Sequence, residues 1–65
     1  MPDAAAETDL ERWLARLRSN DVTVRSDAAH QLGKLADERA VPALAQALED
    51  ADEYVRKSVV MALRR

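Results

Sequence analysis

Cysteine is absent from this 65-residue sequence, and histidine and glycine each occur once. Without cysteine there can be no disulfide and no thiolate metal site, and a single histidine cannot build a histidine-rich one. One glycine leaves no glycine-rich loop to hold phosphate. Small domains usually gain stability from disulfides, a metal or association, so association is the route that remains.

Phenylalanine is also absent, proline occurs twice, and no apolar run approaches the length of a membrane span. The first residues, MPDAAAETDL, are acidic and lack the apolar region of a signal peptide. The formal net charge of −2 gives no general attraction to nucleic acid or anionic lipid. We therefore expect a cytoplasmic protein that is rich in helix and has no membrane contact.

An internal repeat runs through most of the chain. Val24-Arg25 recurs as Val55-Arg56, an offset of 31 (55 − 24), and the same offset aligns the apolar residues from 10 to 65. Repeats of this length indicate stacked units that bury their apolar sides against each other.

Apolar residues in each part of the repeat follow helical spacing. Thr8 and Glu11 fit a capping box for the first helix, and Asp21 and Asp52 fit N-caps of the second and fourth. The sequence predicts helices at about 9–18, 22–36, 41–49 and 53–64. Residues 1–8 are expected to form a flexible N-terminal segment, followed by one domain over 9–65.

Connections of a few residues predict antiparallel neighbours. The predicted fold class is all-α: an α-solenoid fragment of four short helices, arranged as two stacked helical hairpins.

The stretch from residue 21 to 56 resembles a HEAT repeat, in the short HEAT-like form found in phycobilisome lyase subunits and many bacterial and archaeal proteins. The resemblance rests on an ungapped series of matching positions: Val24-Arg25, Ala28-Ala29, Leu32-Gly33, Asp37, Ala40-Val41-Pro42-Ala43-Leu44, Ala47-Leu48, Asp50, Asp52 and Val55-Arg56. It implies an A helix on the convex side and a B helix on the concave side of each repeat, here in the order B-A-B-A.

The resemblance also implies a ladder between repeats, made by an aspartate and an arginine six residues apart. Asp50 and Arg56 match this spacing, whereas Arg25 is preceded by Ser19. The first repeat therefore departs from the aspartate–arginine pattern at position 19, and the alternative is a direct contact of Arg25 with Asp50. The candidate structural ladder is Arg25, Asp50 and Arg56.

Two surfaces are candidates for binding. The helix at 53–64 ends the sequence, so we expect its apolar side to be uncovered and to dock a partner; its candidate residues are Tyr54, Val59, Val60, Met61 and Leu63. The B helices are expected to form a shallow concave surface suited to a helix or extended peptide. Its candidate residues are Arg12, Arg16, Ala43, Gln46 and Ala47.

The residues that could take part in catalysis or ligand binding are each better explained by a structural or surface role. His30 lies off the apolar line of its helix and reads as a surface histidine. Trp13 aligns with Leu44 at the repeat offset, so it fits the core, although a terminal helix leaves a role as a binding anchor open. The acidic residues near 49–53 lie at a helix–turn junction. We expect no enzymatic activity, no metal, no cofactor and no small-molecule substrate.

The sequence favours a non-catalytic protein-interaction or scaffold module that self-associates as a homo-oligomer or docks another protein. One alternative is an accessory subunit or fragment of a larger HEAT-repeat protein, such as a lyase-type subunit. Another is weak binding of nucleic acid along the arginine-bearing helix faces, against which stand 12 acidic residues.

Overall fold

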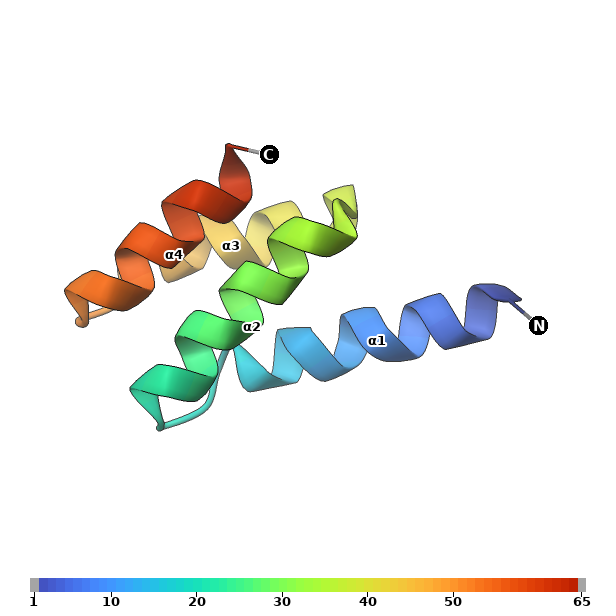
Figure 1. Ribbon diagram of the computed structural model, residues 1–65, viewed down its shortest axis with the longest axis horizontal. Coiled ribbons are helices and arrows are strands. Elements are labelled where there is room, and N and C mark those ends of the chain that lie inside the picture. Colours follow the sequence, from blue (N-terminus) through green and yellow to red (C-terminus); the bar gives the residue numbers. More distant parts are fainter. Residues whose placement is uncertain (1, 65) are drawn as a thin grey trace.

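A computed structural model describes the backbone of residues 2–64 and the side chains of residues 9–64. Figure 1 shows helices α1 (Pro2–Arg16), α2 (Val22–Leu35), α3 (Val41–Ala47) and α4 (Glu53–Leu63), with a 3-10 turn η1 (Glu38–Ala40) before α3. No strand lies within the described residues. The predicted all-α solenoid fragment is confirmed.

Helices α2, α3 and α4 lie close to their predicted ranges, but α1 begins at Pro2 and not near residue 9. Proline is well suited to the first position of a helix, and the alanines that follow have high helix propensity. Thr8 therefore lies inside the helix and not at its N-cap. The predicted domain boundary at residue 9 stays a prediction.

The second and fourth helices begin in the same way. Asp21 accepts a hydrogen bond from the Thr23 amide at 2.8 Å, and Asp52 accepts one from the Val55 amide at 3.0 Å. Both aspartates have extended backbone dihedrals, as N-cap residues do. The offset of 31 seen in the sequence (52 − 21) thus recurs in the position and backbone dihedrals of the caps, although Asp52 accepts from an amide one residue later in its helix than Asp21 does.

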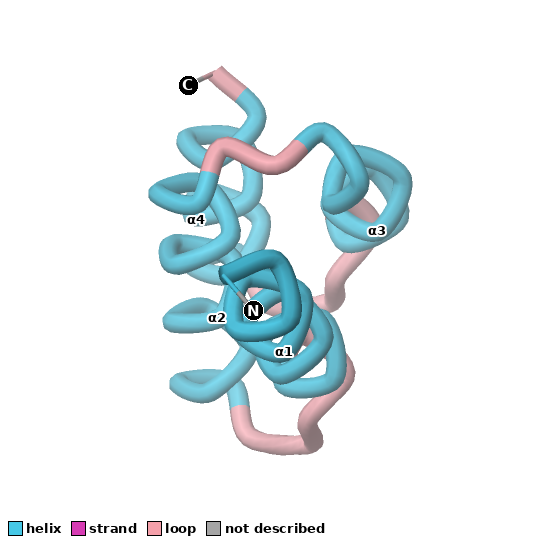
Figure 2. The backbone as a smooth tube through the Cα atoms, turned by 90° about the vertical axis from the view of Figure 1, so that its right-hand side faces the viewer, coloured by secondary structure: helices cyan, strands magenta, loops and turns pink. Residues whose placement is uncertain are grey.

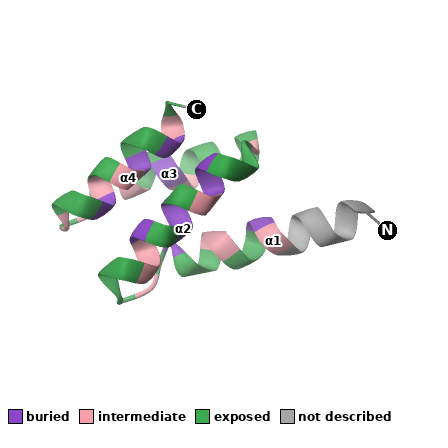
Figure 3. Ribbon diagram, in the orientation of Figure 1, coloured by how far each residue is buried: buried purple, intermediate pink, exposed green. Residues whose placement is uncertain are grey.

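Helix α2 packs against both α1 and α4, and α3 packs against α4. Figure 2, viewed roughly along α1, shows α2 and α4 on one side of the molecule and α1 and α3 on the other. Fully buried side chains of α2 and α4 form the middle of the core, coloured purple in Figure 3. The largest of them are Leu32, Val55 and Val59.

The contact between α2 and α4 is lined by small residues. Ser26, Ala29 and Gly33 follow one row of α2 and are all buried. The Ser26 hydroxyl shares a 2.7 Å hydrogen bond with the Ser58 hydroxyl of α4. Gly33 costs helix propensity, about 1 kcal/mol relative to alanine, and its burial in this row gives the reason for its presence. We call this contact the inner joint.

Candidate functional site: the outer face of the last helix

An arginine–aspartate pair connects the two hairpins beside the inner joint. The Arg25 guanidinium donates from Nε to Asp50 Oδ2 at 2.7 Å and from Nη2 to Asp50 Oδ1 at 3.2 Å. Its Nη1 donates to the Ser19 carbonyl at 2.8 Å. The two side chains are 19% and 12% exposed, so water competes only partly for this bidentate contact. Arg25 thus binds the turn of its own hairpin through Ser19 and the turn of the next hairpin through Asp50.

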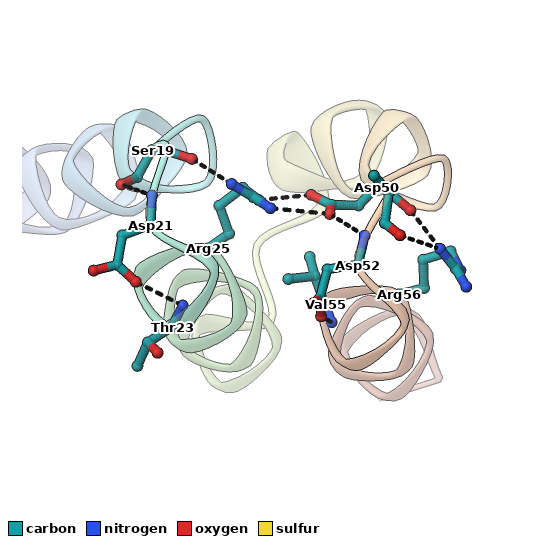
Figure 4. Close-up of polar contacts among 9 residues, drawn as sticks. Ser19, Asp21, Thr23, Arg25, Asp50, Asp52, Val55 and Arg56 are labelled. Atoms are coloured by element: carbon teal, nitrogen blue, oxygen red, sulfur yellow. Dashed lines mark hydrogen bonds and ion pairs between the residues drawn. The ribbon is translucent and has the colours of Figure 1, made fainter.

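Arg56 repeats half of this arrangement. Its Nη1 donates to the Asp50 carbonyl at 2.7 Å and to the Ala51 carbonyl at 3.0 Å, as Arg25 does to the Ser19 carbonyl. Figure 4 shows the two arrangements side by side, with the Arg56 guanidinium directed away from Arg25. Within residues 9–64, no carboxylate forms an ion pair with Arg56. Arg56 therefore has the intrahairpin contact of Arg25 but not its contact to a following unit.

Ser19 and Asp50 occupy equivalent turns and do the same local work. The Ser19 hydroxyl accepts from the Asp21 amide at 3.0 Å, and Asp50 Oδ1 accepts from the Asp52 amide at 2.9 Å. The hydrogen bond from the Asp52 backbone N–H lowers the pKa of the Asp50 carboxyl below its ordinary value, and the Arg25 side chain lowers it further. Desolvation of the carboxylate acts in the opposite direction. Ser19 therefore makes the same hydrogen bond within its turn as Asp50 does, but it has no carboxylate that an arginine of a neighbouring hairpin could bind.

The sequence-predicted ladder residues are thus close together, though not all joined through side chains. Arg25 and Asp50 meet through their charged groups, and Arg56 reaches only main-chain oxygens. The alternative in which Arg25 reaches Asp50 directly describes the observed contact.

The side of α4 that faces away from α2 carries two exposed apolar side chains, Val60 and Met61. A shallow groove of about 470 Å³ lies there, lined by Glu53, Arg56, Lys57, Val60 and Met61. Val60 is 41% exposed and Met61 56% exposed. Lys57 lies 3.6 Å from Glu53, an exposed pair one helical turn apart. We call these five residues together with the exposed Arg64 the outer α4 face.

The predicted partner interface needs a correction at two positions. Val59 is fully buried in the core, and Leu63 is half-buried and packs against it. The two consecutive valines point in directions about 100° apart on the helix, so only one of them can face outward. Tyr54 is 66% exposed but does not line the groove, which leaves Val60 and Met61 as the apolar centre of the outer α4 face.

A second groove, of about 540 Å³, lies between α1 and α3. Ala43, Gln46 and Ala47 line it, as predicted for the concave surface, but Arg12 and Arg16 do not. Leu14 and Ala15 of α1 and the two residues just after α1, Leu17 and Arg18, line it as well. Leu17 is also buried in the core and Leu14 packs against it, so both side chains border the core and this groove.

The α1 arginines that were candidates for concave or nucleic-acid contacts have other neighbours. The Arg16 guanidinium lies 4.9 Å from the centre of the Trp13 ring, a cation–π distance. Arg12 lies 3.8 Å from Asp9 in an exposed ion pair. Trp13 itself is half-buried and packs against the core.

His30 is exposed on α2. Among the described residues, no group of three or more histidine, cysteine, aspartate or glutamate side chains could hold a metal ion. No described helix is both long enough and apolar enough to cross a membrane.

Comparison with known proteins agrees with this geometry. A family model described as HEAT repeats matches residues 10–65. A phycocyanobilin lyase subunit alpha of Microchaete diplosiphon is 57% identical over 35 residues, which cover 54% of this chain and 12% of that protein. The same-named subunit of Pseudanabaena tenuis (strain PCC 7409) is 49% identical over 43 residues, covering 66% and 16%. The chain thus spans less than a fifth of the length of these curated relatives. With the matched region covering all of α2, α3 and α4, the chain belongs to the HEAT repeat family.

Proposed function

We propose that this chain is a non-catalytic protein-interaction module that docks a protein on the outer α4 face. The observation that carries the proposal is the contrast between two equivalent helix sides. The side of α2 with Ser26, Ala29 and Gly33 is buried in the inner joint. The equivalent side of α4, with Lys57, Val60 and Arg64, is exposed. Met61 lies beside Val60 and is also exposed, at the position equivalent to the exposed His30 (61 − 31).

The shape and chemistry of this face suit a protein surface. The groove is shallow, and its apolar centre is bordered by the charged side chains of Glu53, Arg56 and Lys57. An apolar centre with a polar rim is the usual anatomy of a protein interface. Small-molecule sites are by contrast concave and enclose most of the ligand surface.

Site-specific photo-crosslinking tests the proposal. A photoreactive amino acid replaces Met61 in one variant and Gln46, in the α1–α3 groove, in a matched control. We expect a discrete crosslinked protein from position 61 and none from position 46. The purified partner must then bind the wild-type chain and lose affinity for the V60D/M61D variant. Crosslinks from position 46 alone, or unchanged affinity of V60D/M61D, would contradict docking on α4.

A second candidate is an accessory role within a larger HEAT-repeat protein of the lyase-subunit type. It is supported by the 57% and 49% identity to segments of phycocyanobilin lyase subunits alpha. Titration of the purified chain with phycocyanobilin, followed by absorbance, tests whether the segment contributes to pigment binding. A spectral change that saturates at one equivalent supports this role, and an unchanged spectrum removes it.

A further inference from the structure

We propose that the occupant of the outer α4 face is the first hairpin of a second copy of this chain, so that copies stack head to tail. This inference rests on the proposed function and names its partner. Helix α4 presents to a following unit a backbone arrangement like the one that α2 presents to α4, because the N-cap dihedrals and the arginine bond to the preceding turn both repeat.

The repeat offset fixes which residues would meet. In the inner joint, Ser26 of one hairpin meets Ser58 of the next. In the equivalent contact between two copies, α4 of the first copy takes the place of α2, and α2 of the second copy takes the place of α4. Lys57 (26 + 31) then stands in the place of Ser26, and Asp27 of the second copy (58 − 31) stands in the place of Ser58. A lysine and an aspartate would therefore stand where the interior has two serines.

Both residues are available for this contact. Asp27 is exposed on α2 and has no ion pair among the described residues. Lys57 is exposed, and its distance of 3.6 Å to Glu53 makes a loose pair that it can exchange for a closer one. Charge complementarity at this register favours stacking of copies in one direction.

The opposite arrangement, a twofold contact of α4 against α4, is disfavoured by charge. The outer α4 face carries Arg56, Lys57 and Arg64 against a single acidic residue, Glu53. Two such faces would oppose like charges, which weakens association. A head-to-tail contact is heterologous, and it continues into an open chain unless its rotation closes a ring.

The head-to-tail contact lacks one element of the inner joint. Arg25 binds the carboxylate of Asp50, but Arg56 would meet position 19 of the second copy (50 − 31), which is a serine. Larger residues also replace small ones, since Lys57, Val60 and Arg64 stand at the positions of Ser26, Ala29 and Gly33. The contact between copies is therefore weaker than the inner joint.

Sedimentation equilibrium of the purified chain tests this register through charge reversal. Wild type should show an average mass that rises with protein concentration. D27K and K57E should each weaken self-association at least about tenfold, because each places like charges in contact. An equimolar mixture of D27K and K57E should regain association, because the lysine introduced at position 27 of one variant can pair with the glutamate introduced at position 57 of the other.

A variant that is expected to tighten self-association provides a test that unfolding of the variant cannot imitate. S19D supplies the carboxylate that Arg56 lacks and should tighten self-association by about tenfold, the scale of an added charge-assisted hydrogen bond. Adding R56Q to S19D should cancel this gain. E38K, a charge reversal on the exposed turn before α3, serves as the control and should leave self-association unchanged.

The two proposals fail differently. A wild-type chain that stays monomeric, together with no association of S19D and no recovery in the charge-reversed mixture, overturns stacking of copies. Association that responds equally to D27K and E38K overturns the register. D27K leaves the outer α4 face intact, so a different protein crosslinked at position 61 in both wild type and D27K would retain the proposed function without self-stacking.

Discussion

The inner joint and the outer α4 face are two surfaces built on the same repeat, and only one of them is closed. In the inner joint a row of small residues on α2 lets α4 approach, and Arg25 finds the carboxylate of Asp50. On the outer α4 face the equivalent row is Lys57, Val60 and Arg64, and Arg56 finds only main-chain oxygens. Similar backbone patterns therefore accompany a closed contact at one surface and an exposed, more highly charged side at the other, because side-chain size and charge differ.

The largest expected effect separates two adjacent valines. V59D places an unpaired charge in the core at a side chain that is fully buried, so it should cost more than about 3 kcal/mol and leave so small a domain unfolded. V60D changes a side chain that is 41% exposed and should alter the free energy of unfolding by no more than about 0.5 kcal/mol. Urea denaturation followed by circular dichroism measures both. Equal losses would erase the distinction between the two surfaces.

The two arginines provide the next comparison. R25M removes a bidentate contact to a largely buried carboxylate and should lower the free energy of unfolding by about 2 kcal/mol. R56M removes only hydrogen bonds to main-chain oxygens and should cost about 0.5–1 kcal/mol. Thermal unfolding of the two variants gives the ranking. A larger loss for R56M would show that the outer position is already as constrained as the inner one.

The serine pair in the inner joint tests the importance of satisfied hydrogen bonds there. S26A leaves the half-buried Ser58 hydroxyl without its partner and should cost about 1 kcal/mol. S26A/S58A removes both groups and should recover most of that loss. K57A, at the position on α4 equivalent to Ser26, should change stability by only a few tenths of a kcal/mol. A double variant less stable than S26A would argue against this reading.

The smallest expected effect is a pH dependence of stability that comes mainly from Asp50, beside the inner joint. The Asp52 amide and then Arg25 lower the pKa of Asp50 below 3.8, its ordinary value. The unfolded chain therefore binds more protons near that pH than the folded chain does. The resulting stabilisation is fully present above the unfolded pKa and is lost as pH falls through the lower folded pKa.

Unfolding curves for wild type and D50N between pH 2 and 6 should thus converge at low pH. Asp37 also has a lowered pKa, caused first by the Arg39 side chain, but this pair is more exposed. D37N should for that reason remove less of the pH dependence than D50N does. Parallel curves for wild type and D50N would remove Asp50 as the source.

By itself the sequence determined the repeat of 31 residues, the helical class, the caps at Asp21 and Asp52 and the spans of the last three helices. These follow from local spacing and capping chemistry, which act over a few residues. It missed the start of α1, where good helix formers follow Pro2 and extend the helix past the predicted cap.

Only the tertiary structure decided which apolar residues are covered. Val59 and Val60 are equally hydrophobic neighbours, yet the packing of α4 on α2 buries the first and exposes the second. Likewise, only the tertiary structure shows that the Arg25 guanidinium binds the carboxylate of Asp50 whereas Arg56 forms no ion pair within residues 9–64. Burial and ion pairing depend on how helices are rotated and placed relative to one another, and those relations join residues far apart in the sequence.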